Sequence, residues 1–232
     1  MNNPWFETLA VFDLETTGID VETSRIVSAH VGVIDAAGEL VERRDWIADP
    51  GIEIPAGASA VHGITTDRAR AEGRPAPEVV GEIVAAITDV FGRGLALTVY
   101  NASYDLTLLN REARRHGLTP LVGPRPVIDP FVLDKVVDKY RKGKRTLEAA
   151  ALVYGVDLAD AHDAGADAVA AGRVAQALAR QYAAQLAIDV HELHDRQVGW
   201  RATDAADFQE YMRRVKDPAF VALGTWPEHP FG

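Results

Sequence analysis

The order of strand and helix patterns is the feature that most restricts the fold of this chain. Three segments of strand-like composition come first, at residues 8–14, 25–35 and 39–48. A short turn, DAAG, joins the second segment to the third and predicts an antiparallel hairpin. Further along, short apolar strands alternate with amphipathic helices. We therefore predict an α/β domain in which helices flank a mixed sheet.

The later segments continue this alternation. Apolar residues recur at helical spacing between 78 and 91, and a short, fully apolar strand follows at 94–103. The remaining patterns predict a helix at 104–117, a strand at 126–130, and helices at 130–140, 145–155 and within 160–186. One more helix and an aromatic, proline-containing tail follow residue 189. We therefore divide the chain into an α/β domain, residues 1–187, and a C-terminal helical extension, residues 188–232.

Composition excludes several classes of protein. The 232 residues include no cysteine, so disulfides and thiolate metal sites are excluded. The N-terminal sequence MNNPWFETLA lacks the pattern of a signal peptide, and no apolar stretch approaches the roughly 20 residues that span a bilayer. We expect a cytoplasmic protein with no membrane partner. A net charge of −10 disfavours a polyanionic partner, unless the acids are concentrated where cations bind.

Acidic residues mark three places where a strand ends or a helix begins. Asp13 and Glu15 end the first strand, and Asp105 opens the helix at 104–117. Asp167 lies in the first turns of an alanine-rich helix, five residues after His162. Singly, each acid is explained as a turn former or helix cap. Together, they predict a ligand site at the carboxyl ends of the strands, where divalent cations such as Mg²⁺ or Mn²⁺ would relieve their repulsion.

Three segments resemble the motifs of the DEDDh exonucleases, also called DnaQ-like or proofreading-type 3′–5′ exonucleases. The segments are FDLETTG, NASYDLTLL and HDAGADA, and SAVHGIT resembles the family's short segment between the first two motifs. The resemblance covers roughly residues 8–185. The spacing of His162 and Asp167 is that of the histidine-containing branch, which includes the epsilon-type subunits of DNA polymerase III. The resemblance implies a ribonuclease H-like fold with a mixed five-stranded sheet.

The resemblance also implies an activity. It implies hydrolysis of the phosphodiester at a free 3′ end of DNA, with release of nucleoside 5′-monophosphates and His162 as general base. By similarity, two Mg²⁺ or Mn²⁺ ions would be held by Asp13, Glu15, Asp105 and Asp167. The corresponding positions for contacts with the 3′ nucleotide are Thr16, Thr17, Val61, His62 and Asn101. Asp163 is expected to cap a helix rather than to bind metal.

The strongest run of basic residues is KYRKGKR, at 139–145. Such a run is usually a solvated loop. This one precedes the helix that leads to the third motif, so we expect Lys142 and Lys144 to bind the phosphate backbone upstream of the scissile bond.

The second motif departs from the common family pattern. Members often carry His-Asn before this motif and Phe before its aspartate, where this chain has Tyr100, Asn101 and Tyr104. Both changes keep an aromatic ring. They weaken assignment to a subfamily more than they weaken the catalytic interpretation.

Other functions fit parts of the pattern. Nothing in the sequence separates DNA from RNA as substrate, because that choice depends on contacts to the 2′-hydroxyl. A proofreading subunit bound to a polymerase is a second alternative, and a scaffold without activity is a third. Haloacid-dehalogenase-type phosphatases also carry an acid pair at a strand end. They typically need aspartate where this chain has Glu15, and they leave His162 and Asp167 unexplained.

Overall fold

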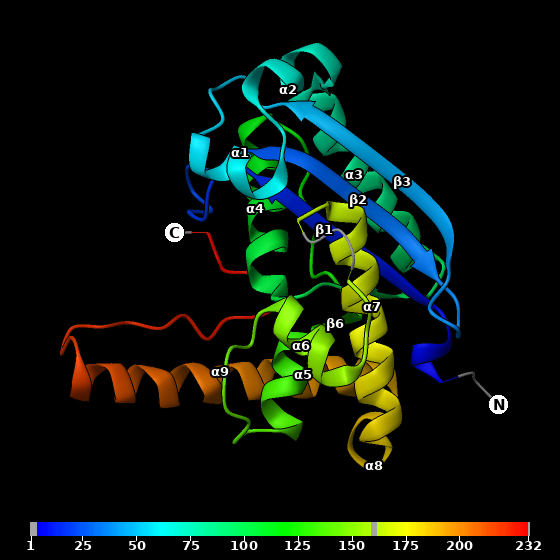
Figure 1. Cartoon of the computed structure of the whole chain (residues 1–232), viewed down its shortest axis with the longest axis vertical. Coiled ribbons are helices and arrows are strands. Elements are labelled where there is room, and N and C mark those ends of the chain that lie inside the picture. Colours follow the sequence, from blue (N-terminus) through cyan, green and yellow to red (C-terminus); the bar gives the residue numbers. More distant parts are fainter. Residues whose placement is uncertain (1–3, 159–161, 232) are drawn as a thin grey trace.

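A mixed six-stranded sheet runs through the centre of the computed structural model, which describes residues 4–158 and 162–231 (Figure 1). Its strands lie in the order β4-β3-β2-β1-β5-β6. Strand β1 (Leu9–Thr16) pairs antiparallel with β2 (Ile26–Ile34) and parallel with β5 (Ala96–Thr98). The predicted mixed α/β architecture is therefore confirmed.

The sheet has six strands, so the predicted number of five is wrong. Strand β3 (Leu40–Asp49) forms the expected hairpin with β2, and the additional strand β4 (Arg74–Pro75) pairs parallel with β3. A two-residue strand shows no periodic pattern in the sequence. Its proline has no N–H to donate, which suits an edge position.

Helices cover both faces of the sheet (Figure 1). On one face, α3 (Ala76–Gly92) and α4 (Ala102–Arg115) enclose one apolar core. On the other face, α5 (Pro130–Val137), α6 (Leu147–Tyr154) and α7 (Ala164–Gln181) enclose a second core. The sheet thus forms the middle layer of three.

Two short helices lie between β3 and α3. The expected helical turn is α1 (Ala56–His62), whereas α2 (Thr66–Glu72) was not expected from the sequence. Its residues, TDRARAE, bury one apolar side chain, Ala69, so the helix has no apolar periodicity to detect. Thr65 caps its N-terminus by accepting a hydrogen bond from the N–H of Arg68.

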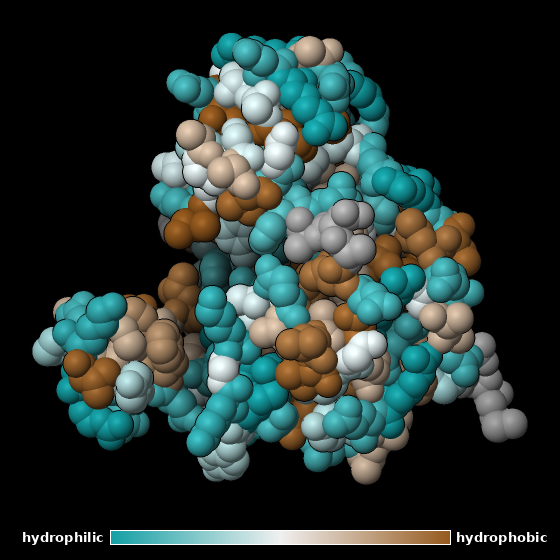
Figure 2. Space-filling view, viewed as in Figure 1, coloured by the Kyte–Doolittle hydropathy of each residue, from teal (hydrophilic) through white to brown (hydrophobic). Residues whose placement is uncertain are grey.

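Helix α8 (Ala183–Leu186) ends the segment predicted as the α/β domain, and the long helix α9 (Val190–Val215) begins the predicted C-terminal extension. The first turns of α9 pack against the α/β body beside β6 (Val127–Ile128), and its far end projects as an arm (Figures 1 and 2). The segment 216–231 then returns toward α4 (Figure 1). None of the helices in the described residues is long and apolar enough to cross a membrane.

Candidate active site

Strand β1 directs two acids to one face of the sheet. Side chains alternate along a strand. Leu9 and Val11 point into the core beneath α7, whereas Phe12 points into the core beneath α3 and α4. Asp13 and Glu15 continue the row of Leu9 and Val11, so they reach the face covered by α7 at the strand's carboxyl end.

Helix α7 brings a third acid to this pair. The side chain of Asp163 accepts hydrogen bonds at 3.0 Å from the N–H groups two and three residues further on, so it caps the helix as expected. Asp167 therefore lies in the first turn of α7. Asp13, Glu15 and Asp167 each offer a carboxylate oxygen, and these oxygens lie within 4.8 Å of one another.

Crowding and burial make these carboxylates hard to ionise. Burial, and then the charges of Asp105, Asp167 and Glu15, raise the pKa of Asp13 well above its usual range. Burial, followed by the charges of Asp167 and Asp163, raises the pKa of Glu15 to about 8. Burial raises the pKa of Asp167 to about 6, although the N–H of His162 acts in the opposite direction. Such shifts arise where like charges are held close together and away from water.

The fourth predicted acid, Asp105, lies next to this group in the first turns of α4. Its side chain is buried, and burial raises its pKa well above the usual range. Its charge is the largest electrostatic influence on Asp13 after burial itself. The oxygens of Asp105 lie outside the 4.8 Å group of three. The structure thus brings all four predicted carboxylates together and places three of them in closest contact.

His162 lies beside the cluster in a strained backbone conformation. Its φ is +70°, in the left-handed region that non-glycine residues rarely adopt. Its N–H donates a hydrogen bond of 3.2 Å to Asp167 Oδ2. Its ring is half exposed, and Nε2 lies 3.7 Å from Glu148 Oε1. Glu148 opens α6 and belongs to none of the motifs, so no sequence signal predicted this contact.

The Thr-Thr-Gly turn is held by hydrogen bonds within the protein. Thr16 Oγ1 donates to the carbonyl of Gly18 and lies 2.6 Å from the hydroxyl of Tyr104. Thr17 Oγ1 accepts a hydrogen bond from the N–H of Arg25. Tyr104 also donates to Gly18, so the tyrosine that departs from the family pattern helps to fix this turn.

The predicted residues on α1 and at the start of α4 differ in exposure. Burial lowers the pKa of His62, and the charge of His162 acts in the same direction, which places the two imidazoles near each other. Val61 is about half exposed, at 52%. Asn101 is exposed at the start of α4, with φ of +60°. Contacts of these residues with a substrate stay a prediction.

The five basic residues of segment 139–145 fall into three groups, the first of which is Lys139, paired with Asp207 of α9. Arg141 and Arg145 are largely buried and form ion pairs with Asp134. Lys142 and Lys144 are exposed, and neither forms an ion pair with a carboxylate within the described residues. These two lysines are therefore available to a charged ligand.

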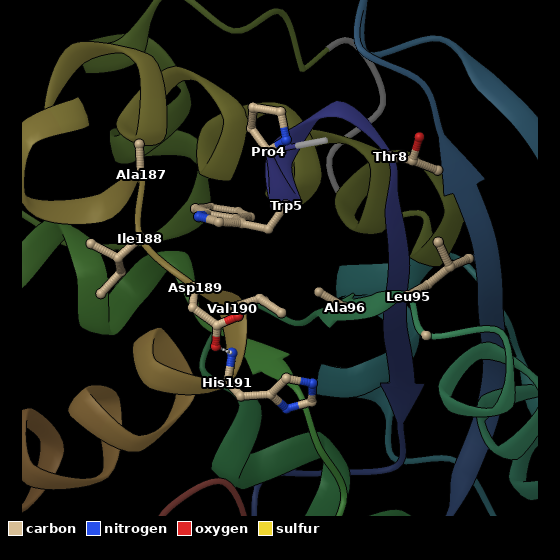
Figure 3. Close-up of a pocket in the computed structure, with 11 residues that line it drawn as sticks. Pro4, Trp5, Thr8, Leu95, Ala96, Ala187, Ile188, Asp189, Val190 and His191 are labelled. Atoms are coloured by element: carbon tan, nitrogen blue, oxygen red, sulfur yellow. Dashed lines mark hydrogen bonds between the residues drawn. The ribbon is translucent and has the colours of Figure 1, made fainter. Parts of the chain in front are cut away.

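A cavity of about 650 Å³ lies at the other end of the sheet. Trp5, Ile188 and Val190 gather around it (Figure 3). Thr8 and Leu95, which precede β1 and β5, also line it. This cavity is separated from Glu15 by the length of β1, roughly 23 Å at 3.3 Å per residue. It is distinct from the carboxylate cluster.

The clustered carboxylates on this layered α/β sheet form a set of oxygen donors that could hold a divalent cation. A family model described as an exonuclease, RNase_T, matches residues 10–175. The chain belongs to this family of DEDDh, or DnaQ-like, exonucleases, as the three motifs implied.

Curated relatives include very large polymerases. The chain is 30% identical over 168 residues to the PolC-type DNA polymerase III of Streptococcus thermophilus, and 31% identical over 168 residues to that of Streptococcus agalactiae. Each match covers 72% of this chain. The chain spans about 11% of the length of these polymerases.

Solved structures share the fold. Exonuclease I of E. coli in complex with a dA16 oligonucleotide superposes with a TM-score of 0.64 at 19% identity, covering 78% of this chain and 42% of that one. Exonuclease I of Methylocaldum szegediense gives 0.65 at 20% identity, covering 86% and 46%. A 3′-exonuclease that recognises a histone mRNA stem-loop gives 0.64 at 16%, covering 77% and 65%.

Proposed function

We propose that this protein is a metal-dependent 3′–5′ exonuclease that removes nucleoside 5′-monophosphates from the 3′ end of DNA. The observation that carries the proposal is the convergence of Asp13, Glu15 and Asp167, with Asp105 adjacent and His162 at the edge. The three sequence motifs that supply these residues come from distant parts of the chain.

The carboxylates fit divalent cations. The donors are all oxygens, which hard cations such as Mg²⁺ and Mn²⁺ prefer. Asp167 Oδ1 is buried and has no hydrogen-bond partner within the described residues, so an acceptor is left for a cation. Asp13, Glu15, Asp105 and Asp167 would hold two ions. Such ions supply Lewis acidity that stabilises the attacking and leaving oxygens of a phosphodiester.

His162 is the proposed general base. In the reaction a water oxygen bonds to phosphorus and the imidazole accepts the proton that the water loses. The bond from phosphorus to the 3′ oxygen breaks, and this oxygen gains a proton from solvent to become the 3′-hydroxyl of the shortened strand. Half exposure leaves the ring accessible to substrate. A hydrogen bond with the Thr146 side chain lowers the pKa of Glu148, which keeps this carboxylate ionised near neutral pH. Glu148 can therefore stabilise the protonated imidazole.

The proposed substrate is a single-stranded or frayed DNA end. We assign the 3′ nucleotide to the region bordered by Thr16, Thr17, Val61, His62 and Asn101, and the upstream phosphates to Lys142 and Lys144. Structural relatives in complex with DNA oligonucleotides support DNA. The relative that recognises histone mRNA supports RNA as the second candidate. Membership in an exonuclease family favours direct attack by water over the aspartyl nucleophile of a phosphatase.

A proofreading role beside a polymerase is a further candidate, supported by the similarity to PolC-type polymerases. A stand-alone nuclease remains the favoured form of the proposal. A cytoplasmic location also stays a prediction. Size-exclusion chromatography with a replicative polymerase subunit distinguishes the two forms, because a proofreading subunit should co-elute with it.

The activity is tested by digesting oligonucleotides labelled at either end in the presence of Mg²⁺ or Mn²⁺. We expect a 3′ label to appear at once in mononucleotides, whereas a 5′-labelled strand shortens stepwise. Asp13→Ala should abolish both the release of the 3′ label and the shortening of the 5′-labelled strand. Activity retained in this variant, or release of the 5′ label first, would refute the proposal. Matched DNA and RNA oligomers determine the preferred substrate.

A further inference from the structure

Helix α9 closes one edge of the central sheet. Strand β6 pairs with β5 on one side, and on its other side its backbone meets side chains of α9. The N–H of Val127 donates to His194 Nδ1 at 3.1 Å, and Gln197 Nε2 donates to the carbonyl of Val127 at 3.0 Å. Both α9 side chains are buried. They satisfy backbone groups that another strand would otherwise have to pair.

Asp129, directly after β6, joins this edge to helix α4. Its side chain is 1% exposed. Its carboxylate accepts four hydrogen bonds of 2.9–3.1 Å, from the N–H groups of Asn101, Ala102 and Phe131 and from the indole N–H of Trp226. Its own N–H donates to Gln197 Oε1 at 2.8 Å. A buried carboxylate with this many donors is fixed in position.

Two of these donors begin the helix that carries Asp105. Asn101 is the N-cap residue of α4, but its side chain makes no capping hydrogen bond, and its φ of +60° lies in the left-handed region, which asparagine adopts more readily than most residues. Asp129, the N-cap residue of α5, instead accepts hydrogen bonds from the first N–H groups of α4. A carboxylate at a helix N-terminus is also favoured by the helix dipole. The position of Asp129 therefore decides where the first turn of α4 begins, and Asp105 lies in that turn.

Of the other two donors, Phe131 lies in α5, and Trp226 comes from the C-terminal extension. The ring of Trp226 is buried and lies 4.9 Å from that of His194. The residues after it follow α4: the N–H of His229 donates to Thr107 Oγ1 at 2.8 Å, and Arg111 donates to the carbonyl of Pro230 at 2.9 Å. The extension thus contacts α4 along its length as well as through Asp129.

We infer that the C-terminal extension completes the active site, because Trp226 and Gln197 hold Asp129, and Asp129 holds the first turn of α4 with Asp105 beside Asp13. These three are positioning residues, which touch no reacting group. The inference rests on the proposed function in one respect: Asp105 must contribute to cation binding.

The test is Mn²⁺ binding to the full chain without nucleic acid, measured by isothermal titration calorimetry. Trp226→Phe keeps an aromatic ring but removes the indole donor. We expect Mn²⁺ affinity to fall on the order of tenfold, as is usual when a residue that orients a metal ligand is removed. Gln197→Leu, which removes a second support of Asp129, should act in the same direction.

Trp5→Phe is the matched control. Trp5 is also buried, and its indole donates at 2.8 Å to the carbonyl of Leu186, at the opposite end of β1. This variant should lower the melting temperature as Trp226→Phe does, with Mn²⁺ affinity unchanged. Wild-type affinity in Trp226→Phe, or an equal fall in affinity in Trp5→Phe, would overturn the inference.

Asp105→Ala separates this inference from the proposed function. Weaker Mn²⁺ binding in Asp105→Ala together with wild-type binding in Trp226→Phe would overturn only the role of the extension. Wild-type binding in Asp105→Ala would overturn the assignment of Asp105 as a metal ligand, and the inference with it.

Discussion

At the scale of single residues, the alternation along β1 decides the chemistry. Leu9 and Val11 must be apolar because they lie under α7, and the next two residues on the same side, Asp13 and Glu15, emerge where that cover ends. A shift of one residue in register would turn both acids to the opposite face. The antiparallel register that places Asp13 opposite His30 on β2 therefore fixes which face of the sheet carries the two acids.

The close approach of α7 to β1 depends on a residue without a side chain. A Cβ on Gly172 would lie 2.6 Å from Val11 Cγ1 and from Ile34 Cδ1. We predict that Gly172→Ala lowers the free energy of unfolding by about 1–3 kcal/mol, the usual cost of overpacking. Thermal or urea unfolding measures this effect.

Gly199→Ala in α9 is the control for this substitution. Apart from the neighbouring residues and the backbone of the helix itself, no atom lies within 4 Å of a Cβ at this position. Since alanine is favoured over glycine in a helix by about 1 kcal/mol, this variant should be more stable than the wild type. A Gly172→Ala protein that is equally stabilised would show that α7 can move away from β1 at no cost.

At the scale of secondary-structure elements, prediction from sequence succeeded where one face of the element is buried, because apolar residues then recur along the chain at a fixed spacing. The strands β1 and β2 and the helices α3, α4 and α7 each carry an apolar pattern, and each was predicted within a few residues. Strand β3 buries only Ala48 and was predicted from the preceding turn and its strand-like composition. Among the elements that were not predicted, α2 and β4 bury almost nothing. They are stabilised by a cap and by pairing with β3, and neither leaves a pattern in the local sequence.

The loop between α5 and α6 carries the next prediction. Lys142→Gln combined with Lys144→Gln should weaken binding of single-stranded DNA, measured by fluorescence anisotropy with EDTA present to prevent cleavage. The logarithm of the binding constant falls linearly with the logarithm of the salt concentration. In the variant this slope should become shallower by about 0.7 for each phosphate that is no longer neutralised. Lys216→Gln, at the C-cap of α9, is the control. Equal salt slopes in the wild type and the double variant would exclude this loop from the interface.

At the scale of the whole molecule, the acidic cluster opposes folding when no cation is bound. The pKa of Glu15 is raised by burial and neighbouring charges to about 8, against about 4.3 in an unfolded chain. Between these values the unfolded state releases a proton that the native state retains. Glu15 therefore destabilises the metal-free protein increasingly as pH rises from about 4.3 to about 8.

Glu15→Gln tests this linkage in the presence of EDTA. We expect the variant to gain stability over the wild type as pH is raised from about 5 to about 8, as measured by the melting temperature. With Mn²⁺ in place of EDTA the order should reverse, because the wild type then binds the cation more tightly. A difference between the two proteins that does not change with pH would contradict the raised pKa of Glu15.

The sequence by itself determined the class of fold and the identity of the acids, because apolar periodicity and the three motifs are local properties of the chain. Only the tertiary structure decided which acids are in closest contact, that Glu148 faces His162, and that Asp129 joins α4 to the C-terminal extension. Asp129 directly follows a strand, as Asp13 and Glu15 end one, so its position in the sequence already marked it as a candidate for a special role. Its partner Trp226 is 97 residues away, and a hydrogen bond over that separation is set by packing, which no local pattern encodes.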